Sequence, residues 1–248
     1  MLFEVCIDSV EGAAAALQGG AQRVELCDNL VEGGTTPSYG MVKRTCKAVS
    51  MLVNVIIRPR GGDFCYTAPE FEVMQEDIQI VKQLGAGGVV IGVLLPDGSI
   101  DMPRTQRLIA LARPMSVTFH RAFDVCADPE KALDQLITLG VDRLLTSGQQ
   151  PSALQGVNCI KGLVKKSRDR VIIMAGGGVN EHTLPRIVEA TGVREVHFSA
   201  RSGLESPMSF RNPAVMMGKA YQPDEYLRKA TDASRVEAII KSWTQFHP

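Results

Sequence analysis

The 248-residue sequence lacks an excess of charge of either sign, because 27 lysines and arginines balance 27 aspartates and glutamates. Aromatic residues are also scarce, at 5% of the chain. Proteins that bind nucleic acid use basic surfaces and stacked aromatic side chains, and anionic membranes attract basic ones. We therefore expect neither nucleic acid nor a membrane as a partner.

Long hydrophobic runs and an export signal are missing as well. The first residues, MLFEVCIDSVEG, contain no basic region and reach an acidic residue at position 4, unlike a signal peptide. Apolar runs such as residues 89–95 are far too short to span a bilayer. The six cysteines form no CxxC pair, so we expect reduced thiols in a cytoplasmic protein.

Several common enzyme motifs are absent. The sequence has no P-loop, HExxH or nucleophile-elbow pattern, and no G-x-G-x-x-G follows its first predicted strand. No lysine ends a predicted strand. A Schiff-base aldolase needs a desolvated amine of that kind, so this class is excluded.

Short β-rich runs alternate with longer helical patterns along the whole chain. Strands are predicted at Leu2–Ile7, Arg23–Cys27, Leu52–Ile57, Gly88–Gly92, Ser116–Phe119, Arg143–Thr146, Val171–Met174 and Glu195–Phe198. Helices are predicted at Ser9–Gln18, Ser38–Ala48, Pro69–Leu84, Pro103–Ala112, Pro129–Leu139, Ser152–Lys165, Glu181–Glu189 and Pro223–Phe246. Eight strand–helix rounds in this length indicate an α/β fold, a single (β/α)₈ TIM barrel over residues 1–248 with an extra C-terminal helix that closes it.

Proline and capping residues support these helix boundaries. Proline suits the first turn of a helix, where its missing N–H costs nothing, at Pro69, Pro103 and Pro129. Short polar side chains that cap helix N-termini are predicted at Ser9, Ser38 and Asp128.

Polar side chains gather where the predicted strands end, which is the face that carries the active site in TIM barrels. On the first two strands, Glu4 and Cys6 share one face, as do Glu25 and Cys27, because side chains alternate with a period of two. The outer face of the barrel is covered by helices and suits apolar residues. We therefore place both Glu–Cys pairs inward and expect the two thiols to lie near each other.

Two adjacent thiols admit two interpretations. Thiolates bind Cu(I), which accepts two ligands, or Zn(II), which normally takes four. Alternatively, both cysteines are simply small buried hydrophobic residues. His120 and His197, at the ends of strands five and eight, are candidate ligands or acid–base groups, or hydrogen-bonded histidines of the barrel wall.

A second group of residues is typical of anion recognition. Gly176, Gly177 and Gly178 follow strand seven, while Ser199 and Arg201 follow strand eight, and these loops often hold phosphate in barrel enzymes. The alternative is close packing of a turn.

The charged loop after strand three contains Arg58 and Arg60. Two guanidinium groups are able to clamp a carboxylate or a phosphate. In the alternative interpretation, both arginines pair with nearby carboxylates of the protein and have a purely structural role.

At these residues the sequence closely resembles the CutC family of copper homeostasis proteins. The resemblance runs through the segments EVCIDSV, RVELC, EGGTTPSYG, IRPRGGDFCY, VTFHRAFD, LLTSGQ, IIMAGGGV and EVHFSARS. It implies a TIM barrel, a cytoplasmic location (with the nucleus added for animal members), a homo-oligomer of two or four chains, and Cu(I) bound by Cys6 and Cys27.

Two functional hypotheses follow from the sequence. In the first, the protein is an intracellular copper homeostasis protein whose thiolates at Cys6 and Cys27 bind Cu(I). In the second, it is an isomerase, lyase or hydrolase that acts on a small phosphorylated or carboxylate metabolite. The anion would then be held by Arg58, Arg60 and the loop Gly176–Gly178. Protons would be moved by Glu4 or Glu25 together with His120. His197 would be a further catalytic candidate.

Overall fold

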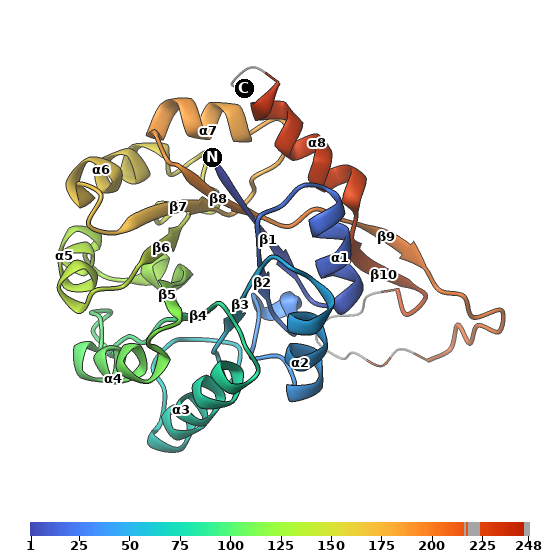
Figure 1. Ribbon diagram of the computed structural model, residues 1–248, viewed down its shortest axis with the longest axis horizontal. Coiled ribbons are helices and arrows are strands. Elements are labelled where there is room, and N and C mark those ends of the chain that lie inside the picture. Colours follow the sequence, from blue (N-terminus) through green and yellow to red (C-terminus); the bar gives the residue numbers. More distant parts are fainter. Residues whose placement is uncertain (216, 218–223, 246–248) are drawn as a thin grey trace.

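Eight parallel strands form a closed barrel at the centre of the molecule (Figure 1). The computed structural model describes residues 1–215, 217 and 224–245. Around the barrel the strands follow one another in sequence order, each hydrogen-bonded to the next, and β8 pairs with β1. Their bounds are β1 Leu2–Ile7, β2 Arg23–Leu26, β3 Leu52–Ile56, β4 Gly88–Ile91, β5 Ser116–Phe119, β6 Arg143–Thr146, β7 Ile172–Gly176 and β8 Glu195–Phe198.

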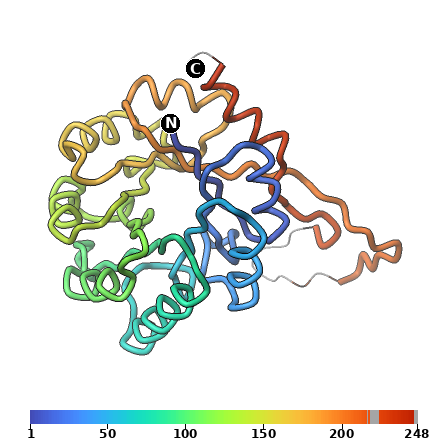
Figure 2. The backbone as a smooth tube through the Cα atoms, in the orientation of Figure 1, coloured from blue at the N-terminus to red at the C-terminus, as the bar shows by residue number. Residues whose placement is uncertain are grey.

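Helices surround the barrel as an outer ring (Figure 1). Those of the described residues are α1 Val10–Gln18, α2 Tyr39–Ala48, α3 Ala68–Gln83, α4 Met102–Ala112, α5 Pro129–Leu139, α6 Val157–Ser167, α7 Leu184–Thr191 and α8 Ala233–Thr244. In Figure 2 the chain passes once around the ring, so that the red α8 meets the blue α1 and closes it. The predicted (β/α)₈ barrel is confirmed. None of the described helices has the length and apolar content needed to cross a bilayer.

The C-terminal part differs from the prediction. The predicted helix Pro223–Phe246 is wrong over residues 227–231, which form strand β10 (Leu227–Thr231), and its two end residues lie outside the described part. This strand pairs antiparallel with β9 (Arg201–Glu205) in a two-stranded arm that extends away from the barrel (Figure 1). A pairing across more than twenty residues leaves no local pattern in the sequence, whereas the helix-forming residues around it do.

The helix N-termini for which a cap was predicted are capped as expected. The side chains of Ser9, Ser38 and Asp128 each accept hydrogen bonds from the backbone of the first turn of their helix. In contrast, α6 begins at Val157 and α7 at Leu184, later than predicted. The residues before these helix starts instead form turns.

Side chains of the strands alternate between two environments. Val5 and Leu26 are fully buried in the main hydrophobic core, together with helix residues such as Met74. Cys6 and Cys27 belong to a separate cluster inside the barrel. The inward orientation of the two Glu–Cys pairs follows from this alternation.

Charged side chains also occupy the barrel interior. Arg23 is 1% exposed and forms ion pairs with Glu4 and with Glu195. Glu195 in turn binds Arg143 Nε at 2.7 Å. Buried charges of this kind persist only when each has a partner, so the network requires all of its members.

Replacing Arg23 tests this network. We expect Arg23→Met to lower the free energy of unfolding by about 3–5 kcal/mol, because two buried carboxylates lose their common partner. Arg107→Met, on the exposed face of α4, is the matched control and should change stability by no more than about 0.5 kcal/mol. Urea unfolding of the three proteins makes the comparison, and equal stabilities of the two variants would contradict it.

Candidate functional site

A cavity of about 680 Å³ opens at the carboxyl ends of the barrel strands. Cys6, Glu25 and His197 line it from β1, β2 and β8. Further lining residues come from the loops that follow the strands, namely Arg58, His120, Arg121, Gly177, Gly178, Ser199 and Arg201. We call this space the rim cavity. Most of the site residues predicted from the sequence lie on its wall.

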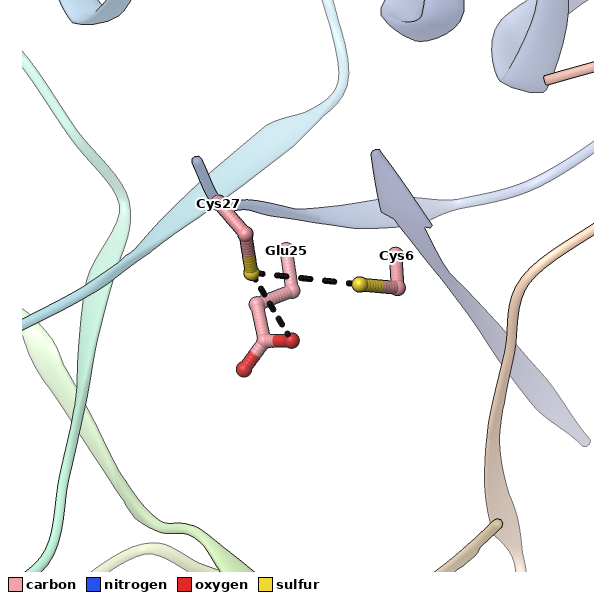
Figure 3. Close-up of side chains that lie close together, drawn as sticks. All are labelled: Cys6, Glu25 and Cys27. Atoms are coloured by element: carbon pink, nitrogen blue, oxygen red, sulfur yellow. Dashed lines mark hydrogen bonds between the residues drawn. The ribbon is translucent and has the colours of Figure 1, made fainter. Parts of the chain in front are cut away.

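The two thiols lie side by side at the end of β1 and β2 (Figure 3). Cys6 Sγ is 3.8 Å from Cys27 Sγ, and the Cys27 thiol donates to Glu25 Oε2 at 3.4 Å. The three donor atoms all lie within 4.8 Å of one another. Their proximity follows from the register of the parallel pair, in which Cys6 is opposite Glu25 and Ile7 is opposite Leu26.

Glu4 links this thiol pair to the interior of the barrel. Its Oε1 lies 2.8 Å from His197 Nδ1, while its other oxygen accepts from Arg23 and, at 3.3 Å, from Asn54 Nδ2. On the opposite edge of the ring, His197 Nε2 is 3.7 Å from Glu25 Oε2. The imidazole is therefore fixed between two carboxyl groups.

The protonation states of these linked side chains are set by their contacts with one another rather than by solvent. Burial raises the pKa of Glu4, but His197 and Arg23 outweigh burial and lower that pKa to about 2. Burial lowers the pKa of His197, but Glu25, Cys6 and Glu4 outweigh it and raise the pKa well above its ordinary value. Glu4 is thus a carboxylate and His197 an imidazolium at neutral pH.

The two cysteines differ in protonation. The hydrogen bond from Cys27 lowers the pKa of Cys6 to about 5, against burial and with help from His197. The same hydrogen bond and burial raise the pKa of Cys27 well above its usual range. Burial raises the pKa of Glu25 to about 8. Cys27 therefore keeps its proton, which Cys6 Sγ and Glu25 Oε2 are both close enough to accept, and the thiolate is on Cys6.

His120 lies apart from the thiols. The Ala122 N–H donates to its Nδ1 at 3.1 Å, and its ring packs against Phe64 with 5.0 Å between centroids. Burial and then the charge of Arg58 lower the pKa of His120 to about 3, so the ring is neutral. Since Nδ1 accepts a hydrogen bond, the proton is on Nε2, which has no partner among the described residues.

The two arginines of the charged loop have different surroundings. Arg58 lines the rim cavity and donates to three carbonyl groups, those of Glu32, Gly34 and Gly62. Arg60 lies outside the residues that line this cavity and forms ion pairs with Asp63 and Glu70. The structure therefore does not bring Arg60 together with the other candidate residues.

The loops after β7 and β8 form one side of the rim cavity. Gly177 and Gly178 have φ of 98° and 72°, in the left-handed region that favours glycine. Ser199 is exposed, and Arg201 donates to Asp8 Oδ2 at 2.9 Å.

Arg121 completes this side of the cavity, and sequence reasoning did not select it as a site residue. It donates from Nε to Asp124 at 2.7 Å and from Nη2 to Ser147 Oγ at 2.8 Å. The only signals in the sequence are its position directly after His120 and the acidic Asp124 three residues later, because its other partner, Ser147, lies on a neighbouring loop.

The neutral state of His120 predicts a pH dependence of stability. In the unfolded chain its pKa returns to about 6.5, so between pH 6.5 and 3 the unfolded state binds one more proton at this residue. Stability contributed by the neutral ring is therefore lost as the pH falls, by about 1.4 kcal/mol per unit.

We expect His120→Asn, which keeps an acceptor for Ala122, to reduce this loss. Between about pH 7 and about pH 5 the variant should lose about 2 kcal/mol less unfolding free energy than the parent protein. Urea titrations at the two pH values measure the difference. An identical pH dependence would show that His120 is already protonated in the folded state.

Comparison with known proteins agrees with the fold. Residues 1–202 match the sequence profile of the CutC family. A CutC family protein of Bacteroides thetaiotaomicron is 51% identical over 241 residues, covering 97% of each chain. The copper homeostasis protein cutC homolog of Mus musculus is 50% identical over 96% of this chain and 88% of its own.

A solved structure of a CutC protein has the same fold. The copper homeostasis protein CutC of Streptococcus agalactiae superposes with a TM-score of 0.76 at 36% identity, over 80% of this chain and 98% of that one. With a family profile over most of the chain and relatives near half identity, this protein belongs to the CutC family.

Proposed function

We propose that this protein takes part in copper homeostasis and binds Cu(I) through the thiolates of Cys6 and Cys27. The single observation that carries the proposal is the 3.8 Å separation of the two sulfurs, beside the rim cavity that Cys6 lines. Homeostasis of copper is the role named for the mouse relative, which shares half of its residues with this chain.

The set of donor atoms favours Cu(I) over other metals. Cu(I) prefers soft thiolates and is stable with two ligands, whereas a structural zinc site uses four. Among the described residues, the group able to share an ion consists of Cys6, Cys27 and the carboxyl of Glu25. Two sulfurs with one hard oxygen suit the softer ion.

The surroundings of the thiols also suit a bound Cu(I). Two thiolates and one Cu(I) carry a net charge of −1, and the imidazolium of His197 beside Cys6 offsets it. Cys27 is 1% exposed and Cys6 is 9% exposed, so water and oxidants have little access to the ion. Binding displaces the proton that Cys27 shares with its neighbours.

We extend the proposal to location and assembly. Reduced thiols persist in the cytoplasm and the nucleus, and the proposed site requires them. A homo-oligomer of two or four chains is the assembly that the family resemblance implies.

Removing both thiols tests the proposed site. The double variant Cys6→Ser, Cys27→Ser should lose Cu(I) affinity by at least about a hundredfold, because hydroxyl groups are poor ligands for a soft ion. Competition with a chromophoric Cu(I) chelator under reducing, anaerobic conditions measures the affinity.

A matched control is available in the same chain. Cys46 and Cys159 are free, half-buried thiols on α2 and α6, so the double variant Cys46→Ser, Cys159→Ser removes the same number of sulfurs away from the rim cavity. It should bind Cu(I) as the parent does. If the two double variants bind equally well, copper is held elsewhere or nonspecifically.

Replacing Glu25 distinguishes a Cu(I) site from a Zn(II) site. Glu25→Gln removes the hard oxygen ligand but leaves both sulfurs, so we expect Cu(I) affinity to change by less than about tenfold and Zn(II) affinity to fall by more than that. Parallel titrations with the two ions measure this. A larger loss for Cu(I) than for Zn(II) would mean that the carboxylate is the principal ligand.

A further inference from the structure

Of the two thiols, that of Cys6 lines the rim cavity. A volume of about 680 Å³ lies in the range of pockets that enclose whole organic molecules, whereas a two-coordinate metal ion needs only the space between two sulfurs. The rest of the wall combines apolar side chains with arginines and loop backbone.

Arg58 contributes an uncompensated positive charge to this wall. It is 5% exposed, its bonds go to backbone carbonyls, and it forms no ion pair with any described residue. A buried cation without a counter-charge favours an anion in the adjoining space.

Two loops that line the same cavity carry backbone N–H groups without a partner among the described residues. For Gly177, Gly178 and Ser199, no acceptor within the described part of the chain receives the N–H. Successive backbone N–H groups in a bend, here those of Gly177 and Gly178, are able to bind one anion together. In (β/α)₈ barrels the loops after strands seven and eight are the ones placed to hold phosphate.

Arg121 supplies a charged donor beside these loops. Asp124 and Ser147 hold two of its three nitrogens, which fixes the guanidinium group without using Nη1. A Cβ atom built on Gly177 would lie 3.6 Å from that Nη1, so the guanidinium and the glycine loop are in contact distance. A pre-positioned arginine next to free N–H groups matches the several oxygens of a phosphate group.

His120 provides an independent observation of a missing ligand. It is 5% exposed and lines the rim cavity, and its Nε2–H has no partner among the described residues. Leaving a buried donor unpaired costs free energy, which a bound molecule with an oxygen at this point would recover.

We propose that the rim cavity binds a small organic phosphate. Its phosphate group lies against the N–H groups of Gly177, Gly178 and Ser199 and the guanidinium of Arg121. Its organic part extends toward His120 and the thiol pair. This function is separate from copper binding, because it uses different atoms of the same cavity.

Titration with glycerol phosphate and with inorganic phosphate tests the site in the full-length protein. Calorimetry should show saturable binding of one molecule per chain, and Arg121→Gln should weaken it by at least about tenfold through loss of a charge-assisted hydrogen bond. Arg107→Gln, an arginine on the outer face of α4, should bind as the parent does.

A second measurement remains informative if Arg121→Gln does not fold. In amide NMR spectra of the parent protein, glycerol phosphate should shift the resonances of Gly177, Gly178 and Ser199 more than those of the outer helices. Absence of saturable binding, equal binding by Arg121→Gln, or shifts confined to surface helices would each overturn the proposal.

The experiment tests the phosphate site independently of the proposed copper site. The variant Cys6→Ser, Cys27→Ser should keep its affinity for glycerol phosphate although the copper site is gone. Loss of phosphate binding in that variant, with its fold intact, would contradict the separation of the two sites.

Discussion

The hydrogen-bonded chain from Arg23 through Glu4 to His197 is the interaction on which the rest of the site depends. Its members are fully or largely buried, and each is paired with the next. Because Arg23 is also bound to Glu195, the chain is anchored in the ion network of the barrel interior. It sets the position of the imidazolium and so stabilises the thiolate of Cys6. The side chains that stabilise the fold of the barrel interior thus also promote the ionisation of the Cys6 thiol.

The rim cavity combines two kinds of donor that are rarely needed together. The ends of β1 and β2 present soft sulfur, while the loops after β7 and β8 present hard N–H donors. In the two proposals, a soft ion and a hard anion therefore have separate places at one cavity.

Much of this arrangement could be predicted from the sequence, because it depends on local patterns. Alternation along two neighbouring strands is sufficient to bring Cys6 and Cys27 together. In contrast, Arg121 is positioned in part by Ser147 on another loop, and Arg60 is held outside the cavity by Glu70, ten residues away. Strand β10 was predicted as helix because its pairing with β9 is non-local. Local propensity identifies the elements, and tertiary contacts decide which side chains meet.

The central claim is that one Cu(I) ion is held jointly by the sulfurs of Cys6 and Cys27. X-ray absorption at the copper edge of the protein, loaded with one equivalent of Cu(I), measures its ligands directly. The account predicts a first shell of two sulfur atoms in near-linear coordination, with copper in the monovalent state. A shell dominated by nitrogen or oxygen, or one containing a single sulfur, would contradict it.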